Sequence, residues 1–220
     1  MKDKTMRINK SDMLLYAVTD RSTKSYDEFI SRVETALKSG ITCLQLREKN
    51  LDYADFLREA QTVKALCNKY NVPFIINDNV ALALEIAADG VHVGQEDMNA
   101  LDVRKAAGDR LIVGVSAHNA DEALKAQEAG ADYLGCGSVF TTSTKSNVTS
   151  LGYDELKKIC SSVDIPVVAI GGINAGNILN LTGSGIDGVA VASAIFGAED
   201  AALACGELRK LSEKAVNTVE

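Results

Sequence analysis

Residues 73–97 read PFIINDNVALALEIAADGVHVGQED and contain two copies of the pattern that decides the fold. The apolar run Pro73–Ile76 ends in the polar pair Asn77-Asp78, and a second apolar run, Gly90–Val93, ends in a polar stretch that closes with Asp97. Between the two runs, Val80–Ala87 has the apolar spacing of a helix. Both runs are apolar through both faces rather than alternating in polarity, which is typical of parallel strands covered by helices.

The same unit recurs along the chain and predicts a (β/α)8 TIM barrel, in which eight parallel strands form a barrel ringed by helices. The expected strands are Leu14–Val18, Thr42–Leu46, Pro73–Ile76, Gly90–Val93, Leu111–Val115, Ala131–Gly135, Pro166–Ile170 and Asp187–Val191. The expected helices are Tyr26–Lys38, Asp52–Tyr70, Val80–Ala87, Met98–Ala107, Ala120–Ala129, Tyr153–Cys160, Ala175–Leu181 and Ala201–Val216. An open doubly wound sheet is the alternative. It would need a G-x-G-x-x-G-type turn after the first strand, where Thr19-Asp20 stands.

Composition predicts one soluble domain over residues 1–220, with a polar N-terminal extension at 1–12. The hydrophobic fraction of 46% and the charged fraction of 24% are ordinary for a globular protein. The net charge of −7 argues against nucleic acid or an anionic membrane surface as a partner. No stretch approaches the roughly 18 apolar residues of a membrane span, and residues 1–12 lack the apolar stretch of a secretion signal.

The cysteines are five, widely spaced and without a C-x-x-C pair: Cys43, Cys67, Cys136, Cys160 and Cys205. This pattern predicts buried free thiols in a reducing cytoplasm rather than disulfides or a zinc site. We therefore expect a cytoplasmic protein. Its oligomeric state stays open, a homo-oligomer included.

In a barrel of this kind, the loops after the strands form one active face. Gln45, Arg47 and Lys49 alternate at the end of the second run, so they share one side of it. Two cations and an amide on one side can grip a phosphate or pyrophosphate. The alternative is a solvated loop in which Glu48 pairs with its neighbours.

Two carboxylates stand at the ends of neighbouring strands. Asp78 and Asp97 each follow an apolar run, and Mg²⁺ usually takes one or two carboxylates together with phosphate oxygens and water. Either residue alone is better explained as a helix N-cap, since a helix is expected shortly after each. The pair, close to cations, favours a metal site.

Three further loops carry candidate phosphate contacts. The stretch Thr141–Ser146 holds Thr142, Thr144 and Lys145, which suit a loop that closes over a phosphate, although a solvent loop is the alternative. Gly171-Gly172 and Ala192-Ser193 follow the seventh and eighth strands, where barrels commonly bind phosphate through backbone N–H groups. Gly172 alone could instead serve a turn.

The two histidines have different settings. His92 lies within an apolar run and is expected in the core or behind the site, whereas His118, two residues after Ser116 at the active rim, could act as an acid–base group. The rim lacks an obvious activated nucleophile. It therefore favours phosphate binding and electrostatic stabilisation of a leaving group over covalent catalysis.

Several of these motifs, taken together and in order, resemble the thiamine-phosphate synthase family. They are Gln45-Leu46-Arg47-Glu48-Lys49, Ile76-Asn77-Asp78, His92-Val93-Gly94-Gln95-Glu96-Asp97, Gly114-Val115-Ser116, Thr142-Ser143-Thr144-Lys145 and Ala169-Ile170-Gly171-Gly172-Ile173, and the resemblance runs from about Leu14 to Ala198. It implies the joining of 4-amino-2-methyl-5-hydroxymethylpyrimidine pyrophosphate to a thiazole phosphate, which gives thiamine phosphate and pyrophosphate. One departure is Thr141, where the family often has proline.

The resemblance also implies residue roles. Gln45, Arg47, Lys49, Asn77 and Lys145 would hold the pyrimidine pyrophosphate, Asp78 and Asp97 would hold Mg²⁺, Thr142, Thr144, Gly172, Ala192 and Ser193 would receive the thiazole phosphate, and Ser116 would lie beside the pyrimidine. Arg47, Lys49, Lys145 and Ser116 would be the catalytic residues. A dissociative mechanism is implied, because the aminopyrimidine can stabilise a methylene cation while cations neutralise the departing pyrophosphate.

Two alternatives remain. A thiazole tautomerase-like isomerase would share the barrel and use a rim histidine such as His118, without needing the carboxylate pair. A non-catalytic barrel that binds a phosphate ligand would be expected to have a degenerate rim.

Overall fold

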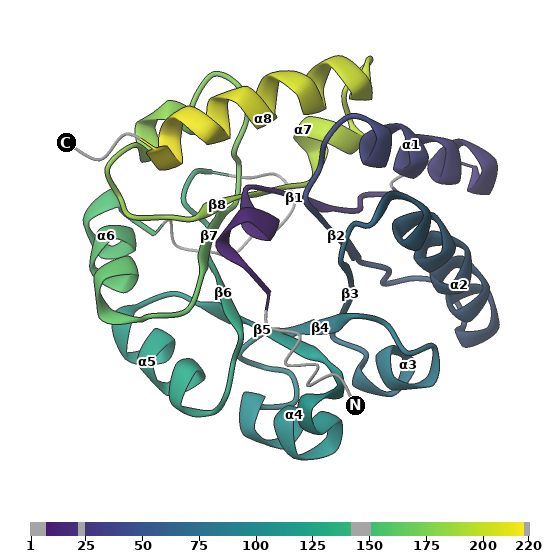
Figure 1. The fold of residues 1–220 in the computed structure, drawn as a ribbon, viewed down its shortest axis with the longest axis horizontal. Coiled ribbons are helices and arrows are strands. Elements are labelled where there is room, and N and C mark those ends of the chain that lie inside the picture. Colours follow the sequence, from purple (N-terminus) through teal and green to yellow (C-terminus); the bar gives the residue numbers. More distant parts are fainter. Residues whose placement is uncertain (1–7, 22–24, 142–150, 218–220) are drawn as a thin grey trace.

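The computed structural model describes residues 8–21, 25–141 and 151–217, and its strands close into a parallel barrel in the order β1 to β8. The strands are β1 Leu15–Val18, β2 Cys43–Leu46, β3 Phe74–Asn77, β4 Gly90–Val93, β5 Ile112–Ala117, β6 Tyr133–Gly137, β7 Val167–Ile170 and β8 Gly188–Val191. Neighbouring strands pair in parallel, and β8 pairs with β1 through Ala17 and Val191. Figure 1 shows the strands as an inner ring surrounded by helices. The predicted (β/α)8 barrel is confirmed.

The helices follow the strands with bounds close to the predicted ones. They are α1 Tyr26–Lys38, α2 Tyr53–Tyr70, α3 Val80–Glu85, α4 Ala100–Ala107, α5 Ala120–Glu128, α6 Tyr153–Ser162, α7 Ser193–Phe196 and α8 Ala201–Asn217, with 3-10 turns η1 Lys10–Met13, η2 Gly108–Arg110 and η3 Ile178–Leu181. Polar side chains just before five of the helices accept backbone N–H groups of the first turn: Ser25, Asp52, Asn79, Asn99 and Asn119.

One predicted helix is wrong. Residues 175–181 form only the short η3 turn, because asparagine side chains bind the backbone in place of a helical ladder. Asn177 accepts from the Asn174 backbone N–H and donates to the Gly172 carbonyl, and Asn174 accepts from the Gly176 N–H. These bonds hold the segment after β7 as a loop beside the mouth of the barrel.

The alternation of side chains along each strand separates two cores. Inward-facing side chains form the barrel interior: Ile8, Met13, Tyr16, Val18, Cys43, Ile75, Ile112, Tyr133, Val168 and Ala190. Outward-facing side chains, such as Leu44, Val91 and Ala169, pack against the helices. The strands are therefore buried on both faces, as predicted, and the inward positions at their C-terminal ends remain for function.

Two residues of the described N-terminal stretch, Ile8 and Met13, pack into this interior. Ile8 is 6% exposed, and Met13 at the end of η1 is fully buried. In Figure 1, η1 lies within the ring of strands. The other end of the barrel, where the strands terminate, carries the candidate site.

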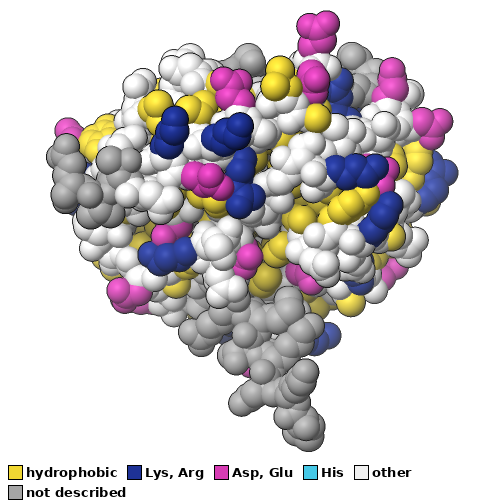
Figure 2. Space-filling model, turned by 45° about the horizontal axis from the view of Figure 1, so that its top comes forward, with side chains coloured by type: hydrophobic (Ala, Val, Ile, Leu, Met, Phe, Trp, Pro, Cys, Tyr) yellow, Lys and Arg dark blue, Asp and Glu magenta, His cyan; other side chains and the backbone are white. Residues whose placement is uncertain are grey.

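The remaining features of the fold concern the charges on its surface, the length of its helices and its cysteine thiols. On the face drawn in Figure 2, acidic and basic side chains are interspersed rather than gathered by sign. Among the described residues, no helix is both long and apolar enough to cross a membrane. All five cysteines are free, and four of them are buried, as the sequence predicts.

Candidate active site

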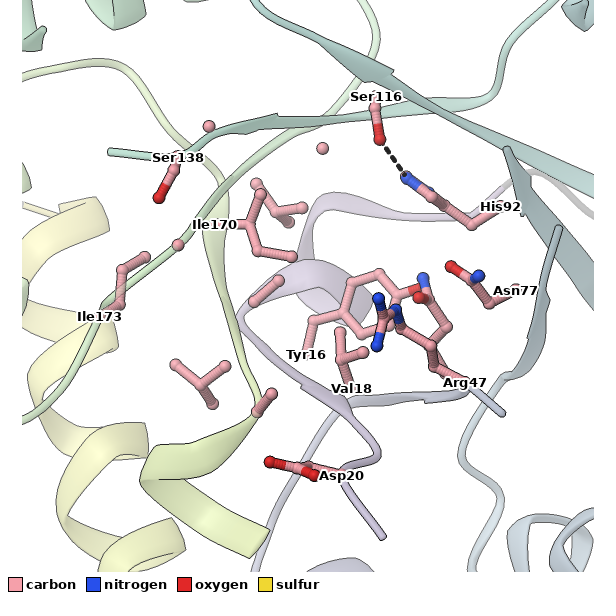
Figure 3. A pocket seen from close by; sticks show the side chains of 18 of the residues that line it. Tyr16, Val18, Asp20, Arg47, Asn77, His92, Ser116, Ser138, Ile170 and Ile173 are labelled. Carbon is pink, nitrogen blue, oxygen red and sulfur yellow. Dashed lines mark hydrogen bonds between the residues drawn. The ribbon is translucent and has the colours of Figure 1, made fainter. Parts of the chain in front are cut away.

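A cavity of about 180 Å³ opens at the C-terminal end of the barrel, and every strand or the loop after it contributes to its wall. The polar and glycine positions that line it are Tyr16, Thr19, Asp20, Gln45, Arg47, Asn77, His92, Ser116, His118, Gly135, Gly137, Ser138, Gly171, Gly172 and Ser193. Figure 3 shows Arg47, Asn77, His92 and Ser116 around the same hollow, with Ile170 and Ile173 on another side of it. Residues far apart in sequence thus share one pocket.

A chain of hydrogen-bonded polar side chains forms the floor of the cavity, with Tyr133 behind the residues that line it. Gln45 Nε2 donates to the Tyr16 hydroxyl at 2.8 Å, and that hydroxyl lies 2.7 Å from the Tyr133 hydroxyl. His92 then bridges Tyr133 and Ser116, with 3.0 Å from each ring nitrogen to the hydroxyl it meets (Figure 3). Burial raises the pKa of both tyrosines well above its usual value, so both stay protonated donors.

Two glycines make room for this chain. A Cβ on Gly114 would lie 2.1 Å from Tyr133 Cζ, and a Cβ on Gly135 would lie 3.0 Å from His92 Cε1. The aromatic side chains therefore lie directly against neighbouring backbone inside the barrel. Sequence reasoning missed Tyr16 and Tyr133 as site residues, although their inward positions in apolar strands were a usable signal.

The end of β2 carries the three residues of the predicted phosphate grip. Gln45 and Arg47 line the cavity, whereas Lys49 is exposed and lies outside the lining. The Arg47 backbone N–H donates to Thr19 Oγ1 at 2.9 Å, and the Thr19 N–H donates to the Gln45 carbonyl at 2.9 Å. These bonds tie the end of β2 to the end of β1 and hold Arg47 at the rim.

Asp78 and Asp97 meet at the ends of β3 and β4. Neither caps a helix, because Asn79 caps α3 and Asn99 caps α4. Loss of hydration raises the pKa of Asp78 to about 6, the Asp97 carboxyl adds to the rise, and Arg47 opposes it. Both aspartates remain accessible at the rim.

The local backbone explains this arrangement. Asp78 has φ 62°, a left-handed conformation that aspartate and asparagine tolerate better than most residues. Asn77 Nδ2 donates to its carboxylate at 2.5 Å, and Asp97 accepts the Gly94 backbone N–H at 2.7 Å. Within residues 8–21, 25–141 and 151–217, no group of three or more His, Cys, Asp or Glu could hold a metal. The pair alone nevertheless matches what Mg²⁺ usually requires of a protein.

The wall made by β7 and β8 combines apolar side chains, such as Ile170, with two glycines. Gly171 and Gly172 have φ 105° and 65°, and a Cβ on Gly172 would lie 2.5 Å from the Thr141 carbonyl oxygen. Ala192 and Ser193 line the cavity where α7 begins. The predicted contacts Thr142, Thr144 and Lys145 lie outside the described residues.

His118 reaches the cavity but is held from outside it. Its Nδ1 lies 3.0 Å from Glu122 Oε2, and its backbone N–H donates to the same oxygen at 2.8 Å. The side chain is 44% exposed. Its partner is thus the first turn of α5 rather than a group inside the pocket.

A closed parallel barrel with an arginine, a carboxylate pair and glycine turns at its C-terminal mouth defines the class of (β/α)8-barrel enzymes that bind phosphorylated small molecules. The model of the thiamine monophosphate synthase family matches residues 15–195. The chain belongs to that family.

Individual relatives agree with the family match. The chain is 47% identical over 197 residues to a thiamine-phosphate synthase of Clostridium tetani, covering 90% of this chain and 94% of that protein. It is 49% identical over 203 residues to one of Methanobrevibacter smithii, covering 92% and 97%. A solved structure of a thiamine phosphate pyrophosphorylase from Pyrococcus furiosus superposes with a TM-score of 0.86 at 40% identity, covering 94% of this chain and 99% of that one.

Proposed function

We propose that this chain joins 4-amino-2-methyl-5-hydroxymethylpyrimidine pyrophosphate to a thiazole phosphate and releases pyrophosphate, in the cytoplasm and with Mg²⁺. Family membership supports the reaction class. The observation that carries the proposal is that Arg47 and Asn77 line the cavity next to the Asp78–Asp97 pair, which lies outside the lining, and that Gly171 and Gly172 line the cavity as well. One phosphorylated substrate needs cations and a metal, and the other needs backbone N–H donors.

The polar floor suits the pyrimidine. Gln45 and Ser116 present an amide and a hydroxyl to the cavity, and both are orientated by Tyr16 and His92. Such groups can hold the amino group and ring nitrogens of an aminopyrimidine in one direction. Gln45 and Ser116 therefore orient the pyrimidine, and this fixes its methylene carbon relative to the incoming thiazole nitrogen.

The rim suits the departing pyrophosphate. Arg47 supplies a bidentate donor and Asn77 an amide, while Asp78 and Asp97 would hold Mg²⁺, which supplies neutralisation of charge on the leaving group. The thiazole nitrogen attacks as a neutral nucleophile and therefore requires no general base. Lys49 and Lys145 are two further cations that could contact the pyrophosphate, and the Lys49 side chain is exposed.

Product analysis tests the proposal directly. Purified protein is incubated with both substrates, with and without Mg²⁺, and thiamine phosphate and pyrophosphate are quantified. We expect equal amounts of both products only when both substrates and Mg²⁺ are present. A tautomerase cannot release pyrophosphate, and a binding protein would retain ligand without turnover, so absence of both products would overturn the proposal.

A matched pair of arginine variants sharpens the test. Arg47→Gln removes the cation from the cavity, and we expect kcat/KM for the pyrimidine pyrophosphate to fall by about 100-fold or more. Arg110→Gln changes the same charge in η2, ahead of β5 and at the other end of the barrel, where its guanidinium donates to the Ala106 and Ala107 carbonyls. That variant should keep kcat/KM within about twofold of the unmodified protein.

A further inference from the structure

Glu59 occupies an unusual position for a glutamate. It lies on the buried face of α2 together with Ala60, Val63 and Cys67, and its side chain is 1% exposed. A carboxylate in such a place is strongly unfavourable unless it is paired or protonated. The residue takes no part in the reaction proposed above, so its retention in the core needs another explanation.

One cation pairs with this carboxylate, and one further carboxyl group interacts with it. Arg21 Nη1, from the segment after β1, lies 2.9 Å from Glu59 Oε2. The carboxyl group of Glu48, in the segment after β2, interacts with the carboxyl group of Glu59. Glu48 Oε1 and Glu59 Oε1 are both buried, and neither has a hydrogen-bond donor. Two adjacent carboxyl oxygens without a donor are satisfied by one proton held between them.

We propose that Glu48 and Glu59 share one proton, and that this pair, clamped by Arg21, is a positioning device for the segment after β2 that carries Arg47. The proposal rests on the function proposed above only in assigning Arg47 to substrate. Glu48 directly follows Arg47, so anchoring Glu48 to α2 restrains the backbone of Arg47. Thr19 restrains the same backbone through the Arg47 N–H.

The electrostatics of the pair agree with a shared proton. Burial raises the pKa of Glu59 to about 7, the Glu48 carboxylate adds to the rise, and Arg21 opposes it. Burial also raises the pKa of Glu48. Among the described residues, Arg58 on α2, Arg47 and Asp20 are the other charged groups that act on the pair.

The sign of the pH dependence follows. A glutamate of ordinary pKa has lost its proton in the unfolded chain above about pH 4.5, while the folded pair keeps one until about neutral pH. Between these two pH values, folding therefore takes up a proton. The stability that the shared proton contributes to the folded state falls as the pH rises across this range. Above it, the two carboxylates repel each other, with Arg21 paired to Glu59, and the segment bearing Arg47 is held less firmly.

Glu59→Gln tests the shared proton without any substrate. Its amide can donate to Glu48 and cannot titrate, so we expect the fall in the urea midpoint of unfolding between about pH 5 and pH 8 to be smaller than in the unmodified protein. Glu207→Gln, an exposed change of the same type on α8, should leave that fall unchanged. If Glu59→Gln keeps the full pH dependence, the shared proton is excluded, whatever the outcome of the product assay.

Kinetics test the positioning role. We expect kcat/KM for the pyrimidine pyrophosphate to decline at alkaline pH in the unmodified protein, and Glu59→Gln to retain at least about threefold more of its neutral-pH value there. Glu48→Gln places the amide on Glu48's side of the pair and should retain the same share of kcat/KM at alkaline pH. It serves as the second variant if Glu59→Gln folds poorly. Superimposable pH profiles for the unmodified protein and the folded variants would overturn the positioning role.

Discussion

His92 Nε2 lies 3.0 Å from the Ser116 hydroxyl oxygen, deep in the cavity and at the end of a chain that starts with an amide. The Gln45 amide donates to the Tyr16 hydroxyl, which meets the Tyr133 hydroxyl, and His92 links Tyr133 to Ser116 through its two ring nitrogens. These hydrogen bonds hold the Ser116 hydroxyl at the cavity wall.

Replacing His92 should destabilise the protein. His92→Phe removes both bonds and leaves the Ser116 and Tyr133 hydroxyls with fewer partners, so we expect the free energy of unfolding to fall by about 1–3 kcal/mol. Urea denaturation followed by circular dichroism measures this. His118→Phe is the comparison, because His118 is 44% exposed and should change stability by less than about 0.5 kcal/mol.

His118→Phe also separates two activities. General acid–base catalysis contributes about 10²–10⁴-fold to rate, so a tautomerase that relied on His118 would lose most of its turnover. In the reaction proposed here, the variant should release pyrophosphate at a rate within about threefold of the unmodified protein. A fall of two or more orders of magnitude in the rate of pyrophosphate release would contradict this prediction and favour a catalytic role for His118, as in the tautomerase-like alternative.

The carboxylate pair should be essential for Mg²⁺ use but not for folding. Asp78→Asn keeps a side chain that tolerates φ 62°, and Asp97→Asn keeps an oxygen for the Gly94 N–H. Each change removes one negative charge, and we expect Mg²⁺-dependent turnover to fall by at least about 100-fold while thermal unfolding shifts little. Turnover near the unmodified level in either variant would remove the metal assignment, and Mg²⁺ titration calorimetry provides an independent measurement.

Two glycine substitutions should have opposite effects on stability. Gly171 has φ 105°, and a Cβ there would lie 2.1 Å from Ser138 Oγ, so Gly171→Ala should lower the free energy of unfolding by roughly 1–3 kcal/mol. Gly206 lies inside α8, with open space around its Cα, so Gly206→Ala should raise it by about 0.5–1 kcal/mol. Urea unfolding of both variants under the same conditions checks the pair.

The thiols should be unreactive in the folded protein. Burial raises the pKa of Cys160 to about 12 and that of Cys205 to about 11, and it raises the pKa of Cys43, Cys67 and Cys136 as well. At about pH 8 all five therefore remain protonated, and four of them are also buried. A disulfide reagent should react rapidly with five thiols in denaturant and slowly with the folded chain; a fast-reacting native thiol would contradict this.

Much of the fold and part of the site could be predicted, because the signals are local. Apolar runs alternate with helical spacing, and Asp52 and Asn119 stand where helices begin. By contrast, residues 175–181 have helical spacing but fold as a loop, since Asn174 and Asn177 compete for the backbone. The spacing of apolar residues does not show which hydrogen bonds the polar side chains between them will form.

The candidate site likewise contains residues whose place could be predicted from the sequence and residues whose place could not. Arg47 and Asn77 could be predicted, because the C-terminal end of a barrel strand faces a shared mouth. Lys49 follows the same alternation and yet is exposed and outside the cavity lining, because the alternation of a strand no longer holds beyond Leu46, where β2 ends. Glu59 resembles any solvent-facing helix residue in the sequence, and its burial depends on Arg21 and Glu48 from other segments.

The sequence by itself determined the order of the strands, most of the helices between them and the chemistry gathered at the strand ends. Only the tertiary structure decided the hydrogen-bonded floor and the buried carboxyl pair. Tyr16 and Tyr133 are 117 residues apart and meet only because the barrel closes, with Gly114 leaving room for the Tyr133 ring. Periodicity is a property of neighbouring residues, whereas burial and pairing of a polar group depend on whichever distant segments pack against it.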